Sequence, residues 1–223
     1  MQKIDSSWAW TLERSNYHFD NTRRDDAGER FFHCGRFVGD WDGELEDVIS
    51  KTHTVTWANR KNYMGEEKVS PQLEAELNDL RSGGLPDDLA LTDRVDDVSQ
   101  YPVFQQMVDQ FAMTNIRPQF HIQRPGQMFN RHIDKLYDYC EENPSRVMRF
   151  HIMLDDWEPG QFMCYGTYHY SHWKKGDISW FDWQNLPHAT ANASHYPRCM
   201  LQVTGVASDE TIKFSKSTEN YKV

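Results

Sequence analysis

The stretch RVMRFHIMLDDWEPGQFMCYGTYHYSHWKKGDISWFDWQNLPHATANASHYPRCMLQVTGV, residues 146–206, decides the fold class. It consists of short runs rich in aliphatic and aromatic residues, separated by clusters of Gly, Pro, Asp, Asn and Ser, which are turn formers. Many short strands at this spacing are typical of a sandwich, jelly roll or barrel. The runs predict strands at 146–154, 161–166, 177–183, 188–193 and 198–206.

The chain before this stretch divides near residue 114. NIRPQFHIQ (115–123) predicts one more strand, whereas the residues before it mix helix and loop signals. There we expect helices at 43–52, from Ser70 onward, and from Pro102 to about Met113, with a strand at 52–57. The sequence therefore predicts one mainly β domain over residues 1–223. Its parts are a helix and loop N-terminal flank (1–114), a β core (115–206) and a C-terminal tail (207–223).

Net charge, cysteine spacing and the lengths of apolar runs argue against several classes of function. The formal net charge is -10, so repulsion by phosphate backbones argues against general nucleic-acid binding. The four cysteines form no CxxC pair, which indicates reduced thiols. No apolar run approaches 18 residues, and residues 1–20 have no apolar stretch of signal-peptide length. We expect a cytoplasmic protein that does not associate with membranes.

A candidate metal site combines His132, Asp134 and His188. In an extended chain, residues two apart point to the same face, so the His-x-Asp pair can reach one ion together. Such a pair alone is a weak signal. With His188 it completes a set of two histidines and one carboxylate, which is the facial triad of non-haem iron(II) oxygenases and leaves coordination positions open.

Two further basic segments point to a carboxylate ligand. Arg198 follows His188 by ten residues, and the intervening turn formers allow the chain to return along a neighbouring strand. An arginine deep in the barrel offers a two-pronged clamp for a carboxylate. Arg149 and His151 share one face of their strand. That face is either the barrel interior or the solvent-facing side, and the pattern alone leaves both open.

Several other residues compete for a role. His121 lies on the strand 115–123, where it either lines the site or is a core histidine. His169 and His172 are more simply explained by an aromatic-rich β-turn than by a metal site. Arg131 alternates with His132 and therefore points to the opposite face.

Taken in order, these pieces resemble a known family. His-x-Asp, Arg149-x-His151, Trp173 to Gly176 with Phe181-Asp182, and His188-Ala-Thr-Ala-Asn192 ending at Arg198 resemble the Fe(II)/2-oxoglutarate-dependent oxygenases. Within them the chain is most similar to the aspartyl/asparaginyl β-hydroxylase branch. The match covers residues 115 to 206, and the first 114 residues match no family we can name.

The resemblance implies a double-stranded β-helix, a jelly roll of cupin-like type. It implies Fe(II) held by His132, Asp134 and His188, with 2-oxoglutarate and O2 as co-substrates and succinate and CO2 as co-products. It also implies that Arg198 binds the distal carboxylate of 2-oxoglutarate. Arg149 and His151 align with family positions that line the co-substrate site.

The chain departs from the family in one ligand. The animal aspartyl hydroxylase lacks the acidic ligand, whereas Asp134 is present here, as in the free-proline hydroxylases that also look related. The expected substrate is a small amino acid or a peptide or protein residue, hydroxylated at an unactivated C–H bond. Demethylation with release of formaldehyde is a further possibility. The alternative from another class is a non-enzymatic cupin-like metal-binding module. The sequence does not indicate an oligomeric state.

Overall fold

The structure is a computed structural model that describes residues 30–56, 89–134 and 139–223, and also residues 78, 81, 82, 84 and 136. The helix expected from Ser70 lies mostly outside the described residues. The elements are β1 (Phe31–Val38), α2 (Asp42–Ser50), β2 (His53–Thr56), β3 (Ala90–Val95), α5 (Pro102–Asp109), β4 (Met113–Gln123), β5 (Met128–His132), η2 (Pro144–Arg146), β6 (Val147–Met153), β7 (Gln161–Tyr165), β8 (Tyr168–Tyr170), β9 (Asp177–Phe181), β10 (His188–Asn192), β11 (Arg198–Ala207), α6 (Asp209–Phe214) and β12 (Asn220–Lys222).

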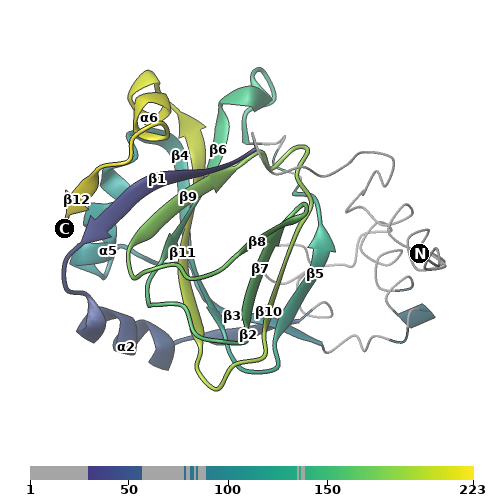
Figure 1. Cartoon of the computed structure of the whole chain (residues 1–223). Helices are drawn as coiled ribbons and strands as arrows, with labels where there is room; N and C mark the ends of the chain where they lie inside the picture. Colours follow the sequence, from purple (N-terminus) through teal and green to yellow (C-terminus); the bar gives the residue numbers. More distant parts are fainter. Residues whose placement is uncertain are drawn as a thin grey trace.

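The strands form two sheets that face each other (Figure 1). The large sheet has the order β12-β1-β9-β6-β11-β4-β3-β2, and the small sheet has the order β5-β10-β7-β8. From β4 to β11 the chain passes back and forth between them, with β4, β6, β9 and β11 in the large sheet and β5, β7, β8 and β10 in the small one. This winding, with antiparallel pairing throughout, defines a double-stranded β-helix. The expected fold class is confirmed.

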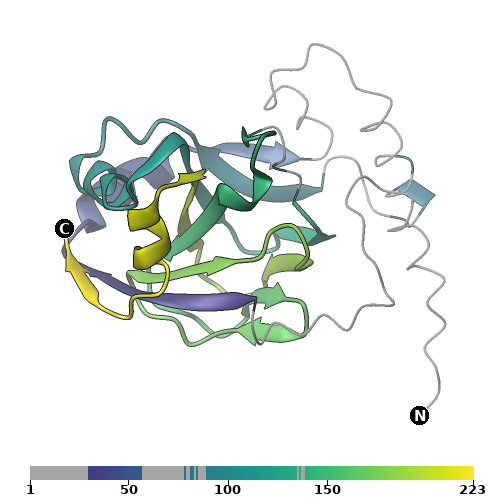
Figure 2. The same cartoon turned by 90° about the horizontal axis from the view of Figure 1, so that it is seen from above.

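Strands from outside the predicted core widen the large sheet. β1 and β12 extend one edge as a parallel pair, lying side by side in Figure 2, and β3 and β2 extend the other edge. The first 114 residues thus contribute more strand than a helix and loop flank, and the tail contributes β12. The reason is local: the pairing of β1 shifts between His33 and Arg36, around Gly35 at φ +98°, which breaks the period-two pattern.

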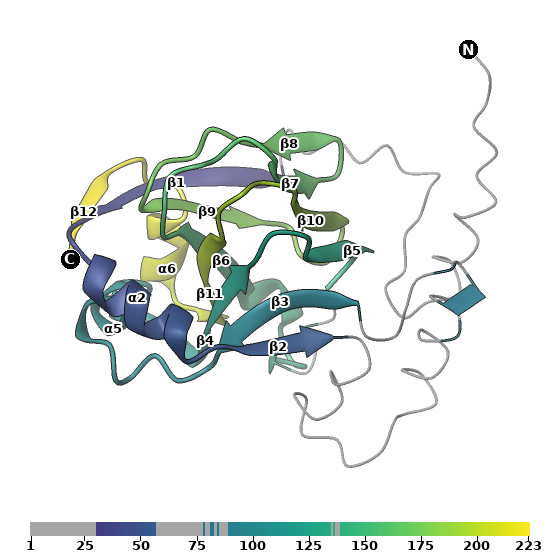
Figure 3. The ribbon, with the colours of Figure 1, turned by 90° about the horizontal axis from the view of Figure 1, so that it is seen from below.

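Helices cover the face of the large sheet that points away from the small sheet (Figure 3). Phe104 and Met107 of α5 pack with Phe120, Phe150 and other residues in one buried apolar cluster. Both α2 and α5 lie close to their predicted ranges. The helix α5 ends at Asp109, earlier than predicted, and Ala112 three residues later has φ 50°, a left-handed conformation that no helix can continue through.

The space between the two sheets contains both apolar and polar side chains. A second apolar cluster there includes Met153, Tyr165, Phe181 and Met200. Polar side chains share this interior, and buried polar groups carry free energy penalties unless they are paired. The metal-ligating candidates lie here. None of the helices in the described part of the chain has the length and apolarity that crossing a bilayer requires.

Candidate metal centre

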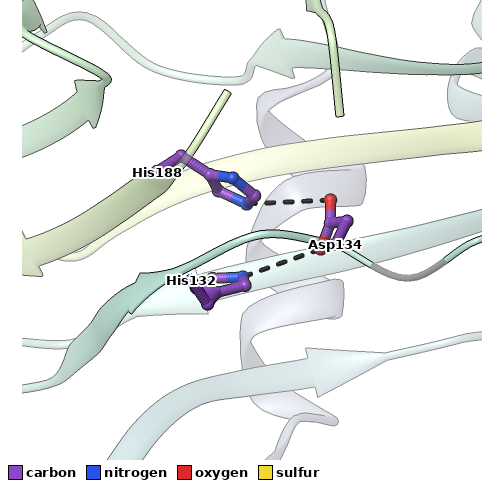
Figure 4. A group of neighbouring side chains, drawn as sticks. All are labelled: His132, Asp134 and His188. Atoms are coloured by element: carbon purple, nitrogen blue, oxygen red, sulfur yellow. Dashed lines mark ion pairs between the residues drawn. The ribbon is translucent and has the colours of Figure 1, made fainter. Parts of the chain in front are cut away.

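The pairing of two short strands brings the triad together. His132 is the last residue of β5 and His188 the first residue of β10, and the two are direct cross-strand partners in the small sheet. Their rings lie 4.2 Å apart between centroids. Asp134 lies two residues beyond the end of β5 and turns its carboxylate toward both histidines (Figure 4). All three side chains are buried.

The distances are compatible with one small cation. The Nε2 atom of His132 lies 3.6 Å from Oδ1 of Asp134, and Nε2 of His188 lies 3.7 Å from Oδ2. All three ligand atoms lie within 4.8 Å of one another, and no other such group occurs among the described residues. Ligands at right angles and about 2.1 Å from a metal stand about 3 Å apart, so small side-chain rotations would suffice. Two imidazoles, one carboxylate and no thiolate suit iron(II).

The protonation states favour metal binding at neutral pH. Burial, followed by the charge of His132, lowers the pKa of His188 to about 3, which leaves its imidazole neutral. Burial alone would raise the pKa of Asp134, but the charge of Arg149, together with its contacts with the two histidines, holds it well below its usual value. A neutral imidazole and an ionised carboxylate are the forms that bind a metal.

Arg149 holds the carboxylate ligand in place. Its Nη1 donates to Oδ2 of Asp134 at 2.6 Å, and its Nε donates to the hydroxyl of Thr204 at 2.9 Å. The two charged side chains are 13% and 9% exposed, so water screens their interaction little. Of the two faces that the sequence left open, Arg149 lies on the interior one, opposite Phe150. Its anionic partner in this structure is the metal ligand itself.

His151 belongs to a hydrogen-bonded chain across the interior. Its Nδ1 lies 2.6 Å from the hydroxyl of Tyr165, and its Nε2 lies 3.3 Å from Oε1 of Gln202, whose amide donates to Gln119. The ring of Tyr165 also stacks near that of His188, with centroids 6.1 Å apart. Tyr165 was not singled out from the sequence. It shares one face of β7 with Met163 two residues earlier, and this period-two pattern is the signal that points it inward.

Arg198 begins β11 and is the cation most deeply enclosed in the site. Its residue is 2% exposed, and neither Nε nor Nη1 has a hydrogen-bond partner among the described residues. Burial lowers its pKa to about 10, so it stays protonated at neutral pH. The ionisable groups of Tyr165 and Asp155 lie close enough to affect this pKa, and Gln123 is the cross-strand partner of Arg198. A buried guanidinium with two unused donors fits a carboxylate ligand.

Other motif residues have structural roles. Asn192 donates to the carbonyls of Gln123 and Tyr196 and accepts from Ser194, which fixes the turn between β10 and β11. Gly176 has φ +89°, and a Cβ there would collide with the carbonyl of Phe37. Asn192 thus holds the two strands that carry His188 and Arg198, whereas Gly176 lets the turn before β9 approach β1.

The other residues that the sequence offered as candidates do not belong to the His132–Asp134–His188 group. His172 stacks on Trp157 and belongs to no metal-ligating group among the described residues. Arg131 donates to the carbonyl of Gly166. His121 faces the interior, where burial, followed by the charge of Arg94, lowers its pKa well below the ordinary value.

No family model matches the chain, and no curated protein matches its sequence. Many solved structures, in contrast, are similar to the chain in structure. EvdMO1 matches 83% of this chain and 48% of its own length, with 14% identity and a TM-score of 0.47. A sugar phosphate isomerase from a cupin superfamily of Silicibacter pomeroyi matches 52% of this chain and 65% of its own, with 13% identity and a TM-score of 0.34. A Cupin 2 conserved barrel domain protein from Salinispora arenicola matches 47% and 73%, with 10% identity and a TM-score of 0.30.

These similarities are low in identity and in TM-score. The strand order of the chain itself defines its fold. The chain has a cupin-like double-stranded β-helix with a candidate His-Asp-His metal site between its sheets.

Proposed function

We propose that the protein is an Fe(II)- and 2-oxoglutarate-dependent dioxygenase that hydroxylates an amino acid or a peptidyl residue. One observation carries the proposal beyond metal binding. Arg198 is buried in the same interior as the facial triad. Two of its N–H donors, on Nε and Nη1, make no hydrogen bond to any described residue. A buried unpaired charge is costly, so the site calls for an anionic ligand that is part of its function. 2-Oxoglutarate is such a ligand.

In this proposal each side chain has a separate task. His132, Asp134 and His188 hold iron(II), and Arg198 binds the distal carboxylate of 2-oxoglutarate through its guanidinium fork. With O2, the bound iron and 2-oxoglutarate would supply the oxidation of a C–H bond, with succinate and CO2 as co-products. Arg149 orients Asp134 toward the metal.

The interior around the site supports these tasks. His151, held by Gln202, fixes the hydroxyl of Tyr165 close to Arg198. The burial of these groups limits water beside the reacting atoms, which strengthens each electrostatic contact. His151 and Tyr165 therefore form the wall of the proposed co-substrate site.

The alternative is a cupin-like metal-binding module without turnover. It explains the triad equally well but gives no role to Arg198 or to the polar chain from Tyr165 to Gln119. The described cysteines are free, and we include a reducing compartment such as the cytoplasm in the proposal.

A screen for succinate tests the proposal. Purified protein is incubated with iron(II), 2-oxoglutarate, O2 and a panel of amino acids and peptides, alongside Arg198→Lys and the exposed control Arg146→Lys. We expect succinate formation that needs iron and that, at limiting 2-oxoglutarate, is reduced in Arg198→Lys and unchanged in Arg146→Lys. Release of formaldehyde would identify demethylation. Metal binding without any affinity for 2-oxoglutarate would favour the metal-binding module instead.

A further inference from the structure

One buried glutamine bridges the two sheets beside the proposed co-substrate site. Gln123, the last residue of β4, is 1% exposed and is the direct cross-strand partner of Arg198 on β11. Its Nε2 donates to the carbonyl of Leu91 on β3 and to the hydroxyl of Thr190 on β10, both at 3.0 Å. Because Thr190 belongs to the small sheet, the side chain of Gln123 crosses the interior to β10, the strand that begins with His188.

The partners of Gln123 fix which way its amide points. The carbonyl oxygen of Leu91 can only accept a hydrogen bond, so the nitrogen of the amide must face it. Both N–H groups of that nitrogen are then used, and Oε1 is left to accept from another donor. Oε1 is buried and has no hydrogen-bond partner among the described residues. The neighbouring Arg198 has the complementary need, since its Nε and Nη1 donors are also unpaired there.

The same amide fixes the role of the Thr190 hydroxyl. The nitrogen of Gln123 can only donate, so Thr190 accepts in this bond and its own O–H hydrogen remains to be donated. Among the described residues the Thr190 hydroxyl makes no other hydrogen bond. Thr190 lies two residues after His188 and shares the interior face of β10 with it. The interior therefore offers one more donor, opposite the strand pair that carries Gln123 and Arg198.

We propose that Gln123 is a positioning residue for the carboxylate that Arg198 binds. Its amide nitrogen directs the hydroxyl of Thr190, which donates to that carboxylate, and its Oε1 accepts from the guanidinium and holds the plane of the fork. The carboxylate then receives hydrogen bonds from both sheets, and each such bond to an ionised acceptor is stronger than a neutral one. This inference rests on the proposed function, since it concerns the site of 2-oxoglutarate.

The test compares 2-oxoglutarate with 2-oxopentanoate, which has the same chain length but a methyl group in place of the distal carboxylate. Both are titrated by calorimetry into the full-length protein loaded with Mn(II). Thr190→Val should weaken 2-oxoglutarate binding about tenfold, the loss of one hydrogen bond to a charged group, and change 2-oxopentanoate binding by less than about twofold. Thr190→Ser keeps the hydroxyl and should keep most of the affinity. The exposed control Thr114→Val should leave both affinities unchanged.

Gln123→Met tests whether the glutamine acts through Thr190. Methionine has a similar length but no amide, so 2-oxoglutarate should bind about tenfold more weakly. In the Gln123→Met protein, the added change Thr190→Val should cost less than about threefold, because the hydroxyl is no longer directed. Losses that simply multiply, or an equal loss of 2-oxopentanoate binding, overturn the inference.

Urea unfolding checks that each variant is folded. Should Gln123→Met not fold, the isotope-labelled side-chain amide of Gln123 is followed by NMR in the wild-type protein, with diamagnetic Zn(II) in place of Mn(II). We expect 2-oxoglutarate to shift this amide resonance more than 2-oxopentanoate does. Equal shifts overturn the inference.

The same resonance separates failure of this inference from failure of the proposed function. If the wild-type protein binds the metal but not 2-oxoglutarate, the proposed function fails. The Gln123 amide is then followed in the metal-free protein during titration with glutarate, a dicarboxylate without the keto group, and with its neutral analogue glutaramide. A shift with glutarate that glutaramide does not cause supports the positioning of a carboxylate by Gln123, and no shift overturns it.

Discussion

The ion pair between Arg149 and Asp134 should contribute strongly to the stability of the metal-free protein. At 2.6 Å and an effective dielectric constant of about 20, Coulomb's law gives an attraction of about 6 kcal/mol. Replacing one partner leaves the other charge buried, and such losses amount to about 3–5 kcal/mol. We therefore predict that Arg149→Met lowers the free energy of unfolding by about 3–5 kcal/mol.

Urea unfolding in the presence of a chelator measures this effect. The matched control is Arg146→Met, which removes an arginine whose partner Asp209 is exposed and should cost less than about 1 kcal/mol. Because the pKa of Asp134 is depressed in the folded protein, the stabilisation is complete above the ordinary aspartate pKa of about 4 and declines as the pH falls below it. The assay therefore belongs at pH near 7.

The double variant Asp134→Asn/Arg149→Met decides whether the pair itself is responsible. Once both charges are gone, no uncompensated ion remains, so the double variant should be more stable than the sum of the two single losses predicts, by about 2–3 kcal/mol. A loss below about 1 kcal/mol in Arg149→Met, or strictly additive losses, would refute this reasoning.

The remaining predictions address the site and its supports. His188→Ala should weaken Mn(II) or Fe(II) binding by at least about a hundredfold, as measured by titration calorimetry. The loss of a direct ligand should cost more affinity than the loss of a residue that only hydrogen-bonds to a ligand, which costs about 10–100-fold. Arg198→Lys should weaken 2-oxoglutarate binding about tenfold and leave metal affinity unchanged; equal co-substrate affinity would contradict the clamp. Burial raises the pKa of Asp155 to about 7, so the folded protein favours its protonated form and loses stability as the pH rises from about 4 through 7. The unfolding free energy of Asp155→Asn should therefore increase relative to wild type over that range, and a difference independent of pH would argue against it. Gly176→Ala should lower the free energy of unfolding by about 1–3 kcal/mol or more, because the added Cβ meets a positive φ and collides with the carbonyl oxygen of Phe37. A melting temperature equal to that of the wild type would contradict this prediction.

The sequence was most informative where local pattern and tertiary structure agree. The runs at 146–154 and 198–206 alternate or stay apolar because both of their faces are buried, and β6 and β11 lie within a residue of those ranges. The His-x-Asp spacing indicated a shared face for His132 and Asp134. The structure brings the two together although β5 ends at His132 and Asp134 lies beyond it.

Other features depend on contacts that no local pattern encodes. β1 and β3 were not predicted, since an irregular register interrupts β1 and β3 carries a buried Asp93 that Arg124 and Gln127 satisfy from elsewhere in the chain. The partner of Arg149 could not be inferred, because the sequence does not show which carboxylate faces it. Tyr165 was missed since a tyrosine in an apolar strand is most often core.

The most direct test of the central claim is a crystal structure of the protein grown with Mn(II) and 2-oxoglutarate. The account predicts a single ion bound by His132, Asp134 and His188, with the distal carboxylate of 2-oxoglutarate on the guanidinium of Arg198. Anomalous scattering from the manganese identifies the ion independently of its ligands. An ion bound elsewhere, or 2-oxoglutarate absent from Arg198 while the triad holds the metal, would contradict it.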